Sequence, residues 1–133
     1  MPLQMKLLAL VFLGGGLGST LRYGVTLAAL RMLGAGFPWG TFAVNVIGST
    51  VMGGFAGYML SRSPGVGSDA LRLFFMTGIL GGFTTFSAYS LDTVALWERG
   101  ATATAIVYAV GSVVLSLAVL TLALVTARGW FAT

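Results

Sequence analysis

The stretch from Thr77 to Ser90, TGILGGFTTFSAYS, holds the residues with the clearest capacity for chemistry. Its glycines and hydroxyl residues interrupt a long apolar segment; they are Gly78, Gly81, Gly82, Thr84, Thr85, Ser87 and Ser90. Unpaired backbone groups are costly inside lipid. A broken helix survives at membrane depth only where protein covers it or where it lines a water-filled or ion-binding cavity. We therefore expect this break to be the functional centre.

Hydroxyl and aromatic side chains recur near this break. Tyr108, Ser112 and Ser116 follow one another at four-residue spacing, so a helix would place them on one stripe. A serine in a membrane helix often bonds only the carbonyl four residues earlier, but three aligned hydroxyls favour a polar track. Phe86 and Tyr89 lie three residues apart and point the same way if the helix resumes. Core packing is the commoner use of such a pair, yet the positive edge of a ring can favour an anion.

Two further polar residues lie in the earlier apolar segments. Asn45 stands at the middle of the second segment, with Thr41 one turn before it and Ser49 one turn after it. An amide there is usually an interhelical hydrogen bond worth about 1 kcal/mol, and it contributes to a pore only if other polar groups share its side. Arg22 follows a run of small residues. Its guanidinium either attracts an anion at a pore mouth or extends to the lipid headgroups.

The composition identifies the class of protein. Hydrophobic residues make up 57% of the chain and charged residues only 8%, and the mean hydropathy is +0.98, as expected of a protein embedded in a lipid bilayer. Histidine and cysteine are absent, and Asp92 is the only acid within an expected span. A proton-coupled pump needs a titratable acid in the membrane, and Asp92 lies near the end of the third span. The spans offer instead hydroxyls, amides, rings and one arginine, which suit a small hydrated anion better.

Other classes of function lack the residues that they need. No nucleophile has a base beside it and no metal-ligand cluster is present, so we expect the protein not to be an enzyme. The seven Lys and Arg residues are scattered, and this distribution argues against a nucleic-acid partner.

The elements that position these residues are expected to be four membrane-spanning helices. A span takes about 20 residues across a hydrocarbon core of roughly 30 Å, so 133 residues form one all-α domain, residues 1–133. The expected spans cover about 4–32, 38–60, 70–97 and 101–128, and the third is broken around Gly78 to Thr85. Small residues at four-residue spacing, such as Gly14 with Gly18 and Gly53 with Gly57, predict close helix packing.

The charges near the ends of the spans set the orientation only weakly. One side of the membrane collects Lys6, Arg62, Arg72 and Arg128, and the other collects Arg31 and Arg99. This small bias is equally compatible with a single topology and with insertion in both directions. Oppositely inserted copies can pair as an antiparallel dimer.

The chain resembles the CrcB/Fluc family of fluoride channels over nearly its whole length. The resemblance is carried by GGLGSTLRY at 15–23, PWGTFAVNVIG at 38–48, TGILGGFTTFSAYS at 77–90, WERG at 97–100 and the Tyr108, Ser112, Ser116 stripe. It implies a multi-pass protein of the cell inner membrane that exports fluoride passively and relieves fluoride toxicity. It also implies an antiparallel, dual-topology homodimer with two pores and a buried sodium ion between the broken third helices.

The resemblance also implies roles for single residues. The backbone carbonyls of Gly81 and Thr84 are expected to hold the sodium ion, as suits a hard cation. The fluoride pore is expected to comprise Asn45, Phe86, Tyr89, Tyr108, Ser112 and Ser116. The positions near the pore ends are expected to be Arg22, Thr41 and Asp92. The chain departs from the family in two places: Tyr89 stands where Phe is usual, and Ala88 where Thr is usual. Tyr89 keeps the positive ring edge but adds a hydroxyl that bears on selectivity or rate.

Two other functions are compatible with a small four-helix membrane protein. A small multidrug-type proton antiporter predicts a carboxylate in the first span, where this chain has Arg22. A non-transporting assembly subunit predicts that the small residues serve only packing, and it leaves the alignment of hydroxyls and rings unexplained.

Overall fold

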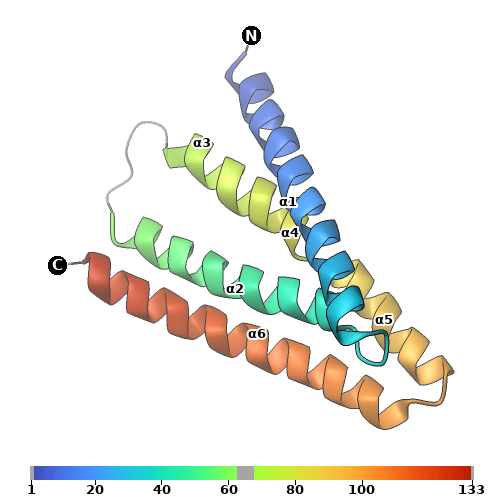
Figure 1. Ribbon diagram of the computed structural model, residues 1–133. Coiled ribbons are helices and arrows are strands. Elements are labelled where there is room, and N and C mark those ends of the chain that lie inside the picture. The colour runs from blue at the N-terminus through green and yellow to red at the C-terminus, as the bar shows by residue number, and fades with distance from the viewer. Residues whose placement is uncertain (1, 63–67, 133) are drawn as a thin grey trace.

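The computed structural model describes residues 2–62 and 68–132, and this part of the chain contains helices and no strands. The helices are α1 (Leu3–Leu33), α2 (Trp39–Leu60), α3 (Ser68–Arg72), the π-helix η1 (Leu73–Leu80), α4 (Gly81–Phe83), α5 (Phe86–Glu98) and α6 (Thr102–Phe131). Figure 1 shows their arrangement. The predicted all-α class is confirmed. Residues 63–67 of the predicted loop between the second and third spans lie outside the described residues.

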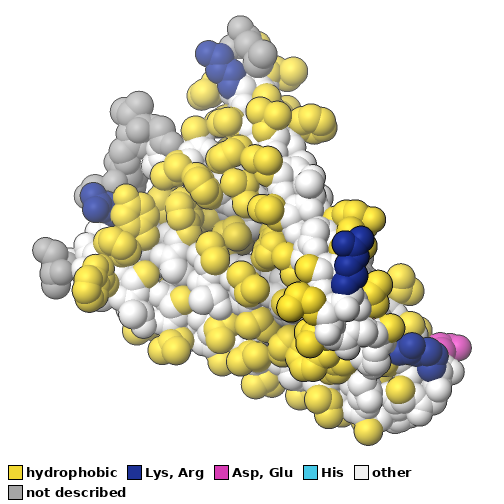
Figure 2. Space-filling view, in the orientation of Figure 1, with side chains coloured by type: hydrophobic (Ala, Val, Ile, Leu, Met, Phe, Trp, Pro, Cys, Tyr) yellow, Lys and Arg dark blue, Asp and Glu magenta, His cyan; other side chains and the backbone are white. Residues whose placement is uncertain are grey.

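Four helical stretches are long and apolar enough to cross a membrane, as predicted. They are Leu3–Leu33, Trp39–Leu60, Ser68–Glu98 and Thr102–Phe131. Each differs from its predicted range by at most a few residues at either end. The space-filling view is dominated by hydrophobic side chains, with few charged ones among them (Figure 2). An apolar exterior of this kind is what a multi-pass membrane protein presents to lipid.

Helices α2 and α6 lie side by side along their lengths and form the largest interface (Figure 1). Gly53 and Gly57 of α2 are buried there. A Cβ on Gly53 would overlap the Leu120 carbonyl oxygen, and one on Gly57 would overlap the Leu124 carbonyl oxygen. The predicted small-residue stripe therefore allows the two backbones to touch.

Helix α1 crosses the first half of the third span in the same way. Gly14 and Gly18 are its buried residues. A Cβ on Gly14 would lie 2.6 Å from the Phe74 carbonyl oxygen, and one on Gly18 would overlap the Ile79 carbonyl oxygen. This close approach holds η1 and α4 in place beside the functional region.

The predicted break in the third span is present, but only its last residues are irregular. The chain is helical without interruption from Ser68 to Phe83, and then Thr84 and Thr85 are extended, with ψ of 155° and 117°. The buried Gly78 belongs to the π-helix and lies against Gly14. Gly78 and Gly82 therefore serve packing against α1, whereas Gly81 is exposed, and the two threonines make the break.

Candidate functional site

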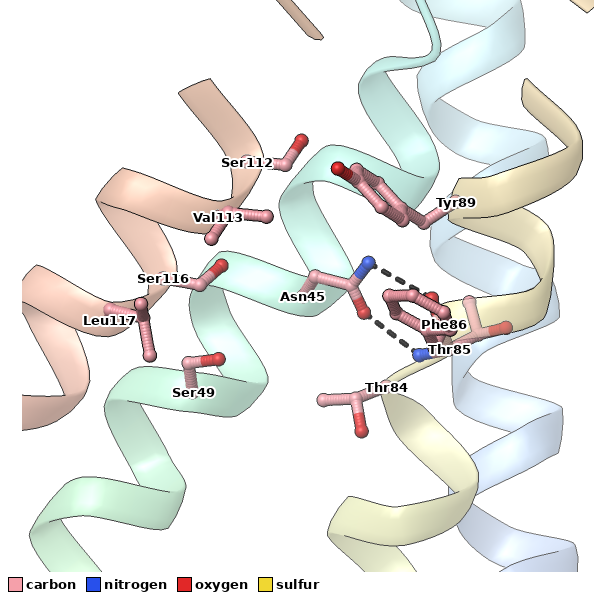
Figure 3. A pocket seen from close by; sticks show the side chains of 10 residues that line it. All are labelled: Asn45, Ser49, Thr84, Thr85, Phe86, Tyr89, Ser112, Val113, Ser116 and Leu117. Atoms are coloured by element: carbon pink, nitrogen blue, oxygen red, sulfur yellow. Dashed lines mark hydrogen bonds between the residues drawn. The ribbon is translucent and has the colours of Figure 1, made fainter. Parts of the chain in front are cut away.

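A cavity of about 290 Å³ lies beside the break, between α2, α5 and α6. Its lining comes from three stretches that are far apart in the sequence and meet here: α2, the break with the start of α5, and α6 (Figure 3). The lining residues are Asn45, Ser49, Thr84, Thr85, Phe86, Tyr89, Ser112, Val113, Ser116 and Leu117. None of these described lining residues carries a charge. The structure thus brings together most of the residues predicted to form the pore.

Asn45 ties α2 to the broken segment through both ends of its amide. Its Nδ2 donates to the Thr85 carbonyl oxygen at 3.1 Å, and the Thr85 backbone N–H donates to its Oδ1 at 2.8 Å (Figure 3). This pairing also fixes the orientation of the amide, because a flipped side chain would set a donor against the Thr85 N–H. Asn45 therefore acts as an interhelical link and lines the cavity with the rest of its surface.

The break diverts the regular helical donors of the Gly81 and Thr84 carbonyls. In a continuous helix the Thr85 N–H would bond to the Gly81 carbonyl, but it bonds to Asn45 instead. The Ala88 N–H would bond to the Thr84 carbonyl, but it bonds to the Thr85 hydroxyl at 3.1 Å and so caps α5. Gly81 and Thr84 thus present carbonyl oxygens whose regular helical donors have been diverted.

Arg22 reaches the same break from α1. Its Nε donates to the Gly82 carbonyl oxygen at 3.0 Å, and its side chain is partly buried. A cation is favourable at the C-terminal end of a helix, which is where Gly82 lies in the first half of the third span. Arg22 is not among the residues that line the cavity in Figure 3, so its positive charge acts from beside the break.

Ser112 and Ser116 carry the hydroxyls that most need a ligand. Both Oγ atoms are buried and have no hydrogen-bond partner within the described part of the chain. A buried polar group without a partner costs about 1–3 kcal/mol. Other hydroxyls in these helices bond the carbonyl four residues earlier, as Thr121 does with Leu117 at 2.8 Å. The two serines do not, and both line the cavity.

Three aromatic rings, those of Phe86, Tyr89 and Tyr108, pack one against the next in a row, here called the aromatic file. The centroids of Phe86 and Tyr89 lie 5.5 Å apart, and those of Tyr89 and Tyr108 are also 5.5 Å apart. Phe86 is 78% exposed at the open side of the cavity, whereas Tyr108 is fully buried. The Tyr89 hydroxyl donates to the Ala109 carbonyl oxygen at 2.8 Å.

Tyr108 lies apart from the two serines of its stripe, although the spacing predicted three hydroxyls in one row. Its hydroxyl donates to Asp92 Oδ2 at 3.0 Å, and it does not line the cavity of Figure 3. The physical reason is the length of the side chain, which carries its hydroxyl across to α5, where the ring of Tyr89 packs against it.

A second cavity, of about 310 Å³, lies beyond Tyr108, because Asp92 and Phe37, which contact Tyr108, both line it. It is lined by Thr41 and Asp92, which were predicted near the pore ends, and by Arg99, which was considered only for membrane orientation and not as a site residue. Arg99 follows the last turn of α5 in the WERG motif, and only the fold shows that this turn borders the second cavity. Val113 and Leu117 of the first cavity were also missed; each follows one of the two serines by one residue.

Comparisons with known proteins agree with this arrangement. The family described as "CrcB-like protein, Camphor Resistance (CrcB)" matches residues 9–124. A protein of Nitrobacter hamburgensis named fluoride-specific ion channel FluC 2 is 56% identical over 108 residues, covering 81% of this chain and 86% of the relative. Proteins named fluoride-specific ion channel FluC from Mesorhizobium japonicum and Paracoccus denitrificans are 50% and 53% identical, and each alignment covers more than nine tenths of both chains. The chain therefore belongs to the CrcB-like family.

Proposed function

We propose that the protein is a fluoride-selective channel that lets fluoride leave the cell passively and so relieves fluoride toxicity. The observation that carries this proposal is the pair of buried serine hydroxyls without partners, which face a cavity lined also by an amide and aromatic rings. Fluoride is small and strongly hydrated, so a pore must replace its water with close donors. Ser112, Ser116 and the free N–H of the Asn45 amide are such donors, and the ring edges of Phe86 and Tyr89 add positive potential.

Passive conduction follows from the character of the lining. Binding must be weak or spread over several sites if ions are to leave as readily as they enter. Hydroxyls, an amide and ring edges bind an anion weakly and at several points, whereas a full positive charge in the cavity would hold the anion. Conduction makes and breaks no covalent bond, so the protein acts as a channel and not as an enzyme.

The entrances are proposed to lie on either side of this lining. Arg22, beside the break, supplies positive charge on one side. Thr41 and Asp92 border the second cavity, at the other side of the aromatic file. The membrane in question is proposed to be the cell inner membrane, where the membrane potential drives an anion outward.

An antiparallel homodimer is proposed because the functional face is incomplete in one chain. Gly81, Phe86 and Ser87 at the break are exposed. Polar backbone of a broken helix is not tolerated against lipid, so another protein surface must cover it. A second copy inserted in the opposite direction supplies that surface, and the weak charge bias of the spans permits both orientations.

A sodium ion between the two broken helices fits the residues at this face. Hard cations take oxygen ligands, and the carbonyls of Gly81 and Thr84 have lost their helical donors to Asn45 and to the Thr85 hydroxyl. We propose that these carbonyls hold the ion. When bound, it supplies positive charge that stabilises the carbonyl ends of the broken segments.

The test is fluoride release from liposomes that contain the purified full-length protein. Potassium is trapped inside, valinomycin relieves the charge, and a fluoride electrode records the efflux. Rapid release of fluoride without release of chloride is expected. Phe86→Ile should keep the dimer and lose the flux, because it removes the ring edge but keeps an apolar side chain.

The other outcomes point to the alternative functions. Fluoride that leaves only with an imposed proton gradient would indicate a coupled antiporter. A chain that releases no fluoride under either condition would be an assembly subunit. Unchanged flux in Phe86→Ile would refute the role of the ring.

A further inference from the structure

We propose that the hydroxyl of Tyr89 anchors the ring across the path between the two cavities. The anchored ring limits the rate of anion passage. The hydroxyl itself is not a ligand for the anion. This inference rests on the proposed function, because it concerns the rate of the same channel.

The Tyr89 hydroxyl already has a hydrogen-bond partner within the protein. Tyr89 belongs to α5, and its hydroxyl donates to the Ala109 carbonyl oxygen of α6 at 2.8 Å. A phenol has a single hydrogen to donate, so this bond leaves none for an anion. The oxygen that remains is an acceptor and repels an anion. The tyrosine hydroxyl therefore differs in kind from those of Ser112 and Ser116, which have no partner among the described residues.

The bond fixes the position of the ring at both ends. The Cβ of Tyr89 is attached to α5 and its hydroxyl is bound to α6, so the ring can turn about its long axis but cannot swing aside. Its neighbours lie at equal distances, with the Phe86 and Tyr108 centroids each 5.5 Å away and the rings tilted by 39° and 38°.

The anchored ring lies between the first cavity and the buried ring of Tyr108. Tyr89 lines the first cavity, and on its other side Tyr108 is fully buried and held by Asp92, which lines the second cavity. Burial and the bond to Asp92 therefore hold Tyr108 in place behind the Tyr89 ring. Passage depends on displacement of the Tyr89 ring, and that displacement breaks the bond to Ala109.

The decisive comparison is fluoride efflux from liposomes that contain the wild type, Tyr89→Phe or Tyr58→Phe. Tyr89→Phe keeps the ring and removes only the hydroxyl and its bond to Ala109. Fluoride efflux should therefore rise roughly 2- to 10-fold, the rate equivalent of one neutral hydrogen bond. Tyr58→Phe removes a hydroxyl from the far end of α2, where the ring packs on Phe55 and Phe131, and should leave efflux unchanged. Unchanged or slower efflux in Tyr89→Phe would overturn the proposal.

A spectroscopic measurement shows, without relying on flux, whether the Tyr89 hydroxyl anchors the ring or binds the anion. The ultraviolet resonance Raman difference spectrum between wild type and Tyr89→Phe isolates the Tyr89 phenol. A donor signature that saturating fluoride leaves unchanged is expected, and a shift with fluoride would overturn the proposal. If the wild type itself releases no fluoride, the proposed function fails; if it does and Tyr89→Phe matches it, only the present inference fails.

Discussion

Threonine and serine hydroxyls within the membrane helices differ in whether they bond their own helix. Thr20, Thr26, Thr50 and Thr121 each donate to the carbonyl four residues earlier, as membrane helices commonly arrange. Ser112 and Ser116 also lie within a helix, α6, but their hydroxyls do not bond the carbonyl four residues earlier. Because both serines line the cavity, their hydroxyls remain available to an ion that has lost part of its water shell.

Replacement of Ser116 by alanine tests this division at the residue scale. Ser116→Ala removes a buried hydroxyl that has no partner among the described residues, so the free energy of unfolding should stay the same or rise by up to about 1 kcal/mol. Fluoride efflux should fall about tenfold or more, because the anion loses a charge-assisted donor. Thermal unfolding in detergent and liposome efflux measure the two quantities.

The control lies on the same helix. Thr121→Val removes a hydroxyl that is exposed and bonded to Leu117. It should leave efflux unchanged. Equal efflux from Ser116→Ala and wild type would show that the hydroxyl does not contact the permeating ion.

The third span shows how one element combines packing with a break. Its first half is held against α1 by glycines that allow backbone contact, and its second half restarts at a threonine cap. Between them, two extended residues are fastened to α2 by Asn45. The break is therefore supported from three sides, by α1, α2 and the cap of α5, and its carbonyls stay in fixed positions.

The α1 contact predicts the effect of a single methyl group. Gly18→Ala places a Cβ against the Ile79 carbonyl oxygen and the Phe83 backbone nitrogen, so α1 must move away from the broken segment. We expect a loss of about 1–3 kcal/mol in the free energy of unfolding. Thermal unfolding in detergent measures it.

Gly24→Ala is the matched control on the same helix. No atom outside its own turn of helix lies within 4 Å of a Cβ at that position. The substitution should be neutral or stabilise by roughly 0.5–1 kcal/mol, since alanine is the better helix former. A Gly18→Ala protein as stable as Gly24→Ala would contradict the close packing of α1 on the third span.

At the scale of the whole molecule, the functional face lies open on one side of the chain. Phe86 is 78% exposed although its ring borders the cavity. Most other exposed apolar residues can face lipid without penalty, but exposed backbone at a break cannot. This difference is the physical basis for the proposed second copy.

Dual topology predicts a specific labelling result. The chain contains no cysteine, so Gly36→Cys introduces a single thiol, at an exposed position between α1 and α2. An impermeant thiol reagent added outside intact cells should label about half of the molecules, because a weak charge bias leaves both orientations populated. Labelling from one side only would exclude an antiparallel dimer.

A charge variant sharpens this result. Arg31→Gln combined with Arg99→Gln removes both basic residues from one side. The remaining basic residues should then drive one orientation, and labelling of Gly36→Cys should shift strongly to a single side. An unchanged labelled fraction in this variant would show that these charges do not set the topology.

The sequence by itself determined the class of the fold and the position of the break in the third span. Apolar length specifies four spans because lipid leaves the backbone no partner except its own helix. Glycines at four-residue spacing predicted the contacts of Gly14, Gly18, Gly53 and Gly57, because only a missing side chain allows such approach. Polar residues in an apolar segment predicted the break, because lipid offers no partner to the backbone groups that a break leaves unpaired.

Only the tertiary structure decided which groups are free and which are bound. Periodicity placed Tyr108, Ser112 and Ser116 on one stripe, but the partners of a hydroxyl belong to other helices, so nothing in the spacing assigns Tyr108 to Asp92. The pairing of Asn45 with Thr85 joins residues 40 positions apart and exists only after α2 meets the break. Hydrogen-bond partners across helices depend on packing, and packing is a property of the assembled chain.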